Sequence, residues 1–168
     1  MVTTVQNKDI NIDRRDAILD YENQLSNVDG AIFGDSAYCP LKHTFSDGLY
    51  VREIMIPAGT VLTGKIHKHE HPNFLMKGSV EVFTEADGYQ ILEAPLSMIS
   101  KPGTKRVVKA LTDVVWVTVH LNPSNTQNLD LLEKDIIAKD YYIYNKFIES
   151  KNSTLSKLKS FIVKLLTK

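Results

Sequence analysis

The feature that most restricts the fold is a long run of alternating apolar and polar residues between residues 37 and 121. Side chains alternate between the two faces of a β-strand, so a period of two indicates strands with one buried face. Turn-forming groups such as Ser46-Asp47-Gly48, Asp87-Gly88 and Pro102-Gly103 interrupt the run at intervals typical of all-β proteins. The pattern predicts strands at 37–45, 49–57, 60–71, 73–77, 79–85, 89–93, 95–100, 105–110 and 113–121. With no helical crossover between them, these strands indicate an antiparallel barrel or sandwich, and we expect one small β-barrel.

The segments on either side of this run have the period of an α-helix. Residues 1–12 are polar and are expected to form an arm or extended lead-in, before a helix from Asp13 to about Leu25. The C-terminal part is expected to form two or three helices, over 129–137, 141–147 and, after Asn152-Ser153, 155–168. The chain should therefore consist of an N-terminal arm and helix, a β-barrel and a C-terminal helical extension, at 1–36, 37–122 and 123–168.

Charge is unevenly distributed along a chain that is neutral as a whole. Residues 151–168 carry five lysines and no acid, which leaves 15 Lys and Arg against 20 Asp and Glu, a net charge of −5, in the rest. Because the apolar residues of the last helix form a stripe, we expect that helix to dock on an acidic neighbour, either its own body or another subunit. An anionic membrane surface is a weaker alternative, and lysines without interleaved arginines are weak indications of nucleic-acid binding.

The N-terminus has no apolar segment typical of a secretion signal, and no apolar run has the length of a membrane span. A cytoplasmic location is therefore expected, and secretion is not. Cys39 is the single cysteine, so an intrachain disulfide is excluded. Beside Pro40, this cysteine is expected to be a small core residue and not a nucleophile.

Three of the five histidines lie at a spacing of two in the segment from Lys65 to His71. On one straight strand His67, His69 and His71 would share a face with Lys65. Neutral imidazoles are common ligands for transition metals, but three on one strand reach a single ion only if the strand bends. His120 ends the last predicted strand and offers a second set, in which it replaces His69.

Two motifs in this region resemble those of the cupin superfamily of small β-barrels. Gly59, Lys65, His67, His71 and Gly78 fall on the spacing of the first cupin motif, with Lys65 where a histidine and His71 where a glutamate are usual. The second motif is similar to residues 101–106, with Arg106 at its histidine position. The segments Gly64–Asn73 and Val115–His120 are most similar to small cupins encoded by tailed phages. The resemblance covers about residues 40–122 and implies a cupin-type barrel that forms a dimer or trimer.

Three interpretations of the site follow. The histidines could bind one Zn, Fe, Mn or Ni ion, although Lys65 and Arg106 close to an ion would oppose binding by a few kcal/mol. The same two cations could instead bind a carboxylate or phosphate. In the third interpretation the site has lost its ligand, and Arg106 pairs with Glu53.

The sequence accordingly favours a non-enzymatic accessory or structural cupin that acts through protein–protein contacts, as in a phage virion. A phage-encoded protein of this kind would be found in the host cytoplasm or in the virion. The alternative is a metal-dependent cupin enzyme, of the dioxygenase or isomerase type, acting on a small polar substrate. No residue near the histidines is an evident general acid or base, so no catalytic residue is assigned.

Overall fold

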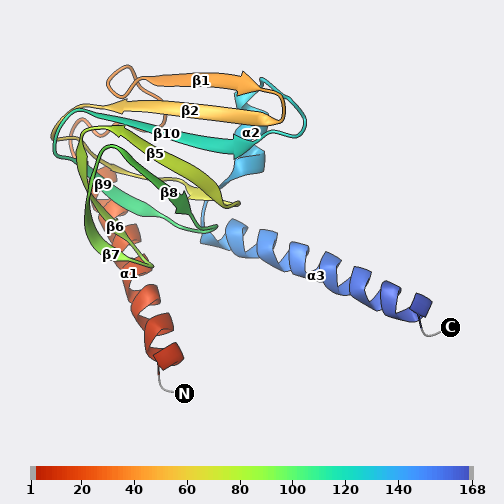
Figure 1. Cartoon of the computed structure of the whole chain (residues 1–168). Helices are drawn as coiled ribbons and strands as arrows, with labels where there is room; N and C mark the ends of the chain where they lie inside the picture. Colours follow the sequence, from red (N-terminus) through yellow and green to blue (C-terminus); the bar gives the residue numbers. More distant parts are fainter. Residues whose placement is uncertain (1–2, 167–168) are drawn as a thin grey trace.

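The computed structural model describes the backbone of residues 3–166 and the side chains of residues 12–159, 162, 163 and 165. Two antiparallel sheets face each other, and a long helix extends from the body at each end of the chain (Figure 1). The first sheet has the order β1 (Leu41–Ser46), β2 (Leu49–Ile56), β10 (Val114–Leu121), β5 (His71–Lys77), β8 (Leu96–Ser100). The second has the order β3 (Val61–Thr63), β9 (Arg106–Ala110), β6 (Ser79–Thr84), β7 (Gly88–Glu93).

The strand pairs are nested within one another along the chain. β2 pairs with β10, β3 with β9, β5 with β8 and β6 with β7, all antiparallel. This nesting is the arrangement of a double-sheet jelly roll, a class that includes the cupins. The expectation of a mainly antiparallel β-protein with helices at both ends is confirmed; the strand pairing forms two large sheets and one two-stranded sheet, and not one closed barrel.

The main core lies between the two sheets and follows the period-two pattern of the sequence. Its buried members include Ile56, Leu75, Val80, Val114 and Trp116. Cys39 is partly buried and packs against this core, as expected for a small apolar residue. A second, smaller cluster joins Tyr50 of the first sheet to Leu132 and Ile136 of helix α2 (Leu129–Ile136), which Asn128 caps through Oδ1.

The segment 60–71 is not one strand, which corrects the sequence prediction. It contains β3, the two-residue strand β4 (Ile66–His67) and a bend, after which β5 begins at His71. β4 does not join either sheet but pairs with β11 (Ile137–Ala138), and the next amide, that of Lys68, donates to the Ile136 carbonyl at 2.7 Å. This pairing with a distant part of the chain takes the histidine segment out of the sheet register.

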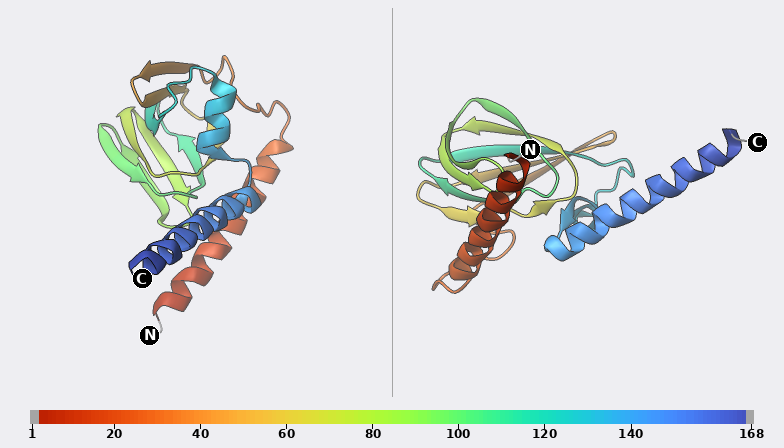
Figure 2. Two further views of the ribbon diagram at one scale, coloured as in Figure 1. Left: turned by 90° about the vertical axis from the view of Figure 1, so that its right-hand side faces the viewer. Right: turned by 90° about the horizontal axis from the view of Figure 1, so that it is seen from below.

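Both long helices differ from the prediction. α1 spans Thr3–Ser26, so the described part of the expected arm is helical; it contains no proline or glycine that would stop the helix. α3 spans Tyr141–Leu166 as one helix through Asn152 and Ser153, residues that lower helix propensity without breaking a helix. In both figures the two helices reach well beyond the sheets (Figures 1 and 2).

A buried carboxylate, that of Glu85, connects both long helices to the body of the protein. Glu85 accepts hydrogen bonds from the Lys105 amide at 3.2 Å and from the Tyr141 hydroxyl of α3 at 3.1 Å, and lies 3.9 Å from the Arg15 guanidinium of α1. The Arg15 guanidinium in turn lies 3.9 Å from the centre of the Tyr141 ring. Two turns further along the same face of α1, Glu22 forms an ion pair of 2.7 Å with the buried Lys105. In the part of the chain that the structure describes, no helix is both long and apolar enough to cross a membrane.

Candidate functional site

Three histidines from three different elements meet at one edge of the jelly roll. His67 lies on β4, His71 begins β5 and His120 is near the end of β10. One ring nitrogen from each lies within 4.8 Å of the others. The ring centres are 4.2 Å apart for His67 and His71, 4.6 Å for His71 and His120, and 5.1 Å for His67 and His120. We call this set the histidine cluster.

The cluster is held in its neutral form. His71 and His120 are 2% and 5% exposed. Burial, followed by the neighbouring His71 and His120, lowers the pKa of His67 to about 2. Burial is also the main cause that lowers the pKa of His120 to about 3 and that lowers the pKa of His71. Neutral imidazole is the form that binds metal ions.

The hydrogen bonds of His71 fix which of its nitrogens is free. Its Nδ1 lies 3.1 Å from the His69 carbonyl oxygen, which can only accept, so Nδ1 carries the proton and donates. Nε2 therefore has a free lone pair, and it is buried with no hydrogen-bond partner in the described part of the protein. A backbone carbonyl that orients an imidazole in this way is the usual outer support of a metal ligand.

His120 is oriented by a residue on its own strand. Its Nε2 lies 3.1 Å from the Thr118 hydroxyl, which itself lies 3.5 Å from the Arg52 carbonyl. When the hydroxyl donates to that carbonyl it accepts from Nε2–H, and the other nitrogen of His120 is then free. Thr118 was not singled out by the sequence reasoning, although its spacing of two from His120 places it on the same face.

The residues behind the cluster form a closed polar network. Asn73 is 1% exposed, donates to the Ser100 hydroxyl at 2.7 Å, and accepts from the Trp116 indole at 3.1 Å. Its oxygen is thus engaged by the indole and is not available as a metal ligand. The partly buried Arg106 guanidinium donates to the same Ser100 hydroxyl and lies 5.7 Å from the Trp116 ring. Burial lowers the pKa of Arg106, and its charge contributes to the lowered pKa of His67 and His71.

Two residues predicted for the site lie elsewhere. Lys65 is at the surface, where its ammonium forms an ion pair of 2.6 Å with Glu133 of α2. His69 is exposed and meets the edge of the Phe147 ring of α3 at 5.3 Å. The described contacts therefore do not bring Lys65 and Arg106 together as an anion pocket, and Arg106 contacts Ser100 where a pair with Glu53 was considered. Of the two predicted histidine sets, the structure brings together the one with His120.

The donor set fits a transition metal ion. Metal–nitrogen bonds of about 2.0–2.1 Å place the nitrogens around one ion roughly 3–3.5 Å apart. Starting within 4.8 Å of one another, the three nitrogens need to approach by no more than about 1.8 Å, which small ring rotations supply. Within the described residues the cluster contains no carboxylate, so its charge does not offset that of an ion.

The sequence matches no protein-family model and no curated protein. Solved structures similar to the chain include cupins. An RmlC-like cupin with a double-stranded β-helix fold from Methanocaldococcus jannaschii has 11% identity and a TM-score of 0.43, over 55% of this chain and 90% of that one. A cupin 2 conserved barrel domain protein from Salinispora arenicola has 13% identity and a TM-score of 0.44, over 62% and 93%.

The cobalt(II) form of HppE is similar at 10% identity and a TM-score of 0.42, over 55% of this chain and 59% of that one. At identities and scores this low, the comparisons say nothing of substrate or reaction. The fold assignment rests on the nested strand pairing itself, which makes the chain a jelly-roll protein with the strand arrangement found in cupins.

Proposed function

We propose that this protein binds one divalent transition metal ion, Zn, Fe, Mn or Ni, through His67, His71 and His120, and that it acts as an accessory protein through protein–protein contacts. The observation that carries the metal proposal is the buried Nε2 of His71. The hydrogen bond from Nδ1 to the His69 carbonyl leaves the lone pair of the ring on Nε2, and this atom has no hydrogen-bond partner among the described residues. A polar atom left this way in a folded protein needs an explanation, and a bound ion supplies one.

An accessory role is supported by what surrounds the cluster. The charged group behind the histidines is Arg106, which is engaged with Ser100 and Trp116 and is not a base at ordinary pH. The two pockets described for the chain are lined by α1 and the second sheet, and neither includes a histidine. The two long helices, in contrast, offer large surfaces away from the body (Figure 1). Following the resemblance of its sequence, we place this role in a phage virion.

A metal-dependent enzyme of the dioxygenase or isomerase type is the second candidate. Three neutral protein ligands leave room in the coordination of an ion for water or substrate, as catalytic sites do. A bound ion would supply Lewis acidity or oxygen activation there. In this case the protein's own contribution is to hold the three imidazoles neutral and to orient two of them, His71 through the His69 carbonyl and His120 through Thr118.

The test is metal content by plasma mass spectrometry on untagged protein, followed by titration of the chelator-treated protein with Co²⁺, which reports histidine ligation by its visible absorption. We expect about one equivalent in the wild type and loss of binding in His71→Gln and His120→Gln. The matched control is His69→Gln, which changes a neighbouring histidine outside the cluster and keeps the carbonyl that orients His71. Equal binding by His71→Gln and the wild type, or no Co²⁺ binding by either, would refute the metal site.

The accessory and enzyme candidates are separated by turnover. Metal-loaded protein that converts a small polar substrate, with loss of activity in His71→Gln, would favour the enzyme. Co-purification of the protein with intact phage particles would favour the accessory role.

A further inference from the structure

The C-terminal half of α3 leaves the body with one apolar side exposed. Spacings of three and four residues place its apolar residues on one side of the helix. These apolar residues are Leu155, Leu158, Ile162 and Leu165, and their exposed fractions are 45–60%. Lys157 and Lys159 are exposed as well, and helical geometry places them on either side of these residues. We call the four apolar residues the α3 stripe.

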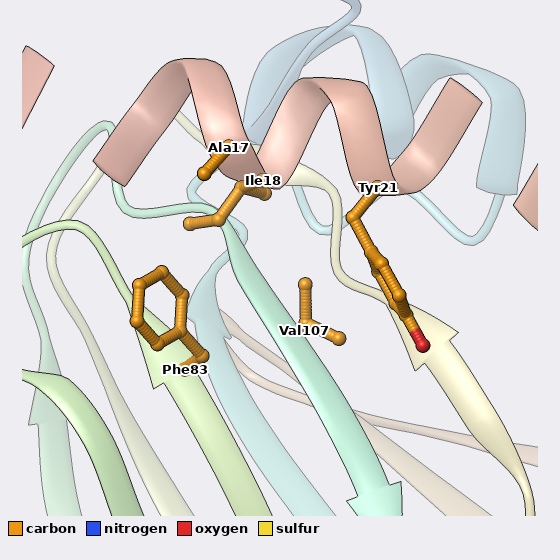
Figure 3. A pocket seen from close by; sticks show the side chains of 5 residues that line it. All are labelled: Ala17, Ile18, Tyr21, Phe83 and Val107. Carbon is orange, nitrogen blue, oxygen red and sulfur yellow. The ribbon is translucent and has the colours of Figure 1, made fainter. Parts of the chain in front are cut away.

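A second apolar surface lies on the body, between α1 and the outer face of β6 and β9. It is a hollow of about 260 Å³ lined by Ala17, Ile18, Tyr21, Phe83 and Val107. Figure 3 shows the three helix residues above the two strand residues. A neighbouring hollow of about 170 Å³ shares Tyr21, Phe83 and Val107 with it and continues to Val61 and Tyr89. We call these two adjoining hollows the α1 groove.

The charges at the α1 groove are opposite to those of the α3 stripe. Asp13 and Asp20 are four and three residues from Ala17, so they lie on the groove side of α1. Both are exposed and take part in none of the ion pairs found among the described residues. On the sheet side, Glu81 lines the groove and pairs with Lys109. The groove is thus apolar at its floor and acidic at its helical rim.

The stripe and the groove of one molecule are far apart. α3 is a single helix of 26 residues, about 39 Å long. It runs away from α1 and from the second sheet in Figure 1, and again in the view from below in Figure 2. The sequence-based expectation that the basic helix docks on its own acidic body is therefore not met within the described residues.

We propose that the α3 stripe of one protomer lies in the α1 groove of a second copy of this chain, and that the second copy returns the same contact. The pairing buries two apolar surfaces that are both exposed in the single chain and places Lys157 near the unpaired carboxylates of α1. When each protomer places its α3 on the other, the dimer has closed two-fold symmetry, and both stripes and both grooves are occupied. It goes beyond the accessory role by naming a partner, and it does not depend on the metal site.

The anionic membrane surface fits the same stripe less well. The remainder of the chain carries a net charge of −5, and α1, with its exposed aspartates, extends to the same side of the body as α3 (Figure 2, left). An anionic surface would repel α1 as α3 approached it.

The experiment measures mass in solution by sedimentation equilibrium on the full chain. The wild type is expected to be a dimer of twice 19.0 kDa that weakens at high salt. Leu158→Asp changes the stripe and Ala17→Glu changes the groove, both at exposed positions where folding is retained, as circular dichroism will check. Each variant alters two contacts per dimer, and the dissociation constant is expected to rise at least about 100-fold. Leu121→Asp, at a residue 75% exposed on β10, is the matched control and stays dimeric.

Mixing the two monomeric variants gives the decisive result. The Ala17→Glu copy has an intact stripe and the Leu158→Asp copy an intact groove, so their mixture is expected to recover a dimer held by one contact. His71→Gln stays dimeric, so loss of the metal site and loss of the dimer are told apart. A monomeric wild type, a dimer unaffected by Ala17→Glu, or a mixture that stays monomeric overturns the proposal. Monomeric protein that binds anionic vesicles through Leu158 also overturns it, in favour of the membrane.

Discussion

Acid should destabilise the metal-free protein through the histidine cluster. His67 and His120 have pKa values lowered to about 2 and about 3 in the fold, whereas an unfolded chain gives histidine its ordinary value of about 6.5. Between these values the unfolded state binds more protons than the folded state, so the free energy of unfolding rises with pH. The contribution is complete above about pH 6.5 and is lost as the pH falls toward 3 and then 2.

The magnitude follows from the size of the shift. At pH 5 an unfolded histidine is protonated and the two folded ones are not, and 1.5 pH units at 1.36 kcal/mol per unit is about 2 kcal/mol for each residue. His67 and His120 together should therefore remove about 4 kcal/mol of stability between pH 7.5 and pH 5, a large part of the total for a domain of this size.

The assay is urea denaturation at pH 7.5 and pH 5 in the presence of a chelator. The wild type is compared with the double variant His67→Gln/His120→Gln, which has no titrating group at these positions, and with His69→Gln as the control. The double variant should lose about 4 kcal/mol less than the wild type on acidification, and His69→Gln should lose nearly as much as the wild type. An equal acid loss in the wild type and the double variant would show that the cluster is not held neutral by burial.

Three further predictions concern stability, each measured by urea denaturation with circular dichroism. Glu85→Ala should cost about 3–5 kcal/mol, because it leaves Arg15 and the Tyr141 hydroxyl without their buried carboxylate; a loss below 1 kcal/mol would contradict that role. Leu75→Ala, at a residue 0% exposed, should cost about 2–5 kcal/mol, and a neutral result would mean that the core between the sheets is loosely packed. Gly78→Ala should cost more than about 1–2 kcal/mol, because Gly78 has φ +85° and a Cβ there would collide with the Asp113 carbonyl; unchanged stability would contradict this backbone geometry.

The sequence was sufficient for the parts of the fold that depend on local patterning. The alternation of side chains identified the strands of both sheets, and the last predicted strand supplied His120 as the alternative to His69. It was not sufficient for the histidine segment, where parity grouped His69 with His67 and His71. The bend that separates them is stabilised by the hydrogen bond of Lys68 to Ile136, a residue far along the chain that no local pattern reveals.

Lys65 and the N-terminal helix were missed for the same kind of reason. Lys65 turns outward because Glu133 of α2 lies beside it, and the position of α2 on the jelly roll is a tertiary fact. The first part of α1 carries almost no apolar periodicity, so its polar residues resembled an extended arm. The helix is held instead by contacts of its second half, where Ile18 is buried and Glu22 forms an ion pair with Lys105.

The pairing of β4 with β11 has a mechanical consequence. His67 lies opposite Ile137, and α3 begins only four residues further on, at Tyr141. The Gly103 amide also donates to the His67 carbonyl at 2.8 Å, and Gly103 lies against the Tyr144 ring of α3. The cluster therefore sits at the pivot of a lever about 39 Å long, whose tip moves about 7 Å for a rotation of roughly 10° at its base. A contact that restricts the movement of His67 would therefore also restrict rotation at the base of α3, and the effect on position would be largest at the C-terminal end of the helix.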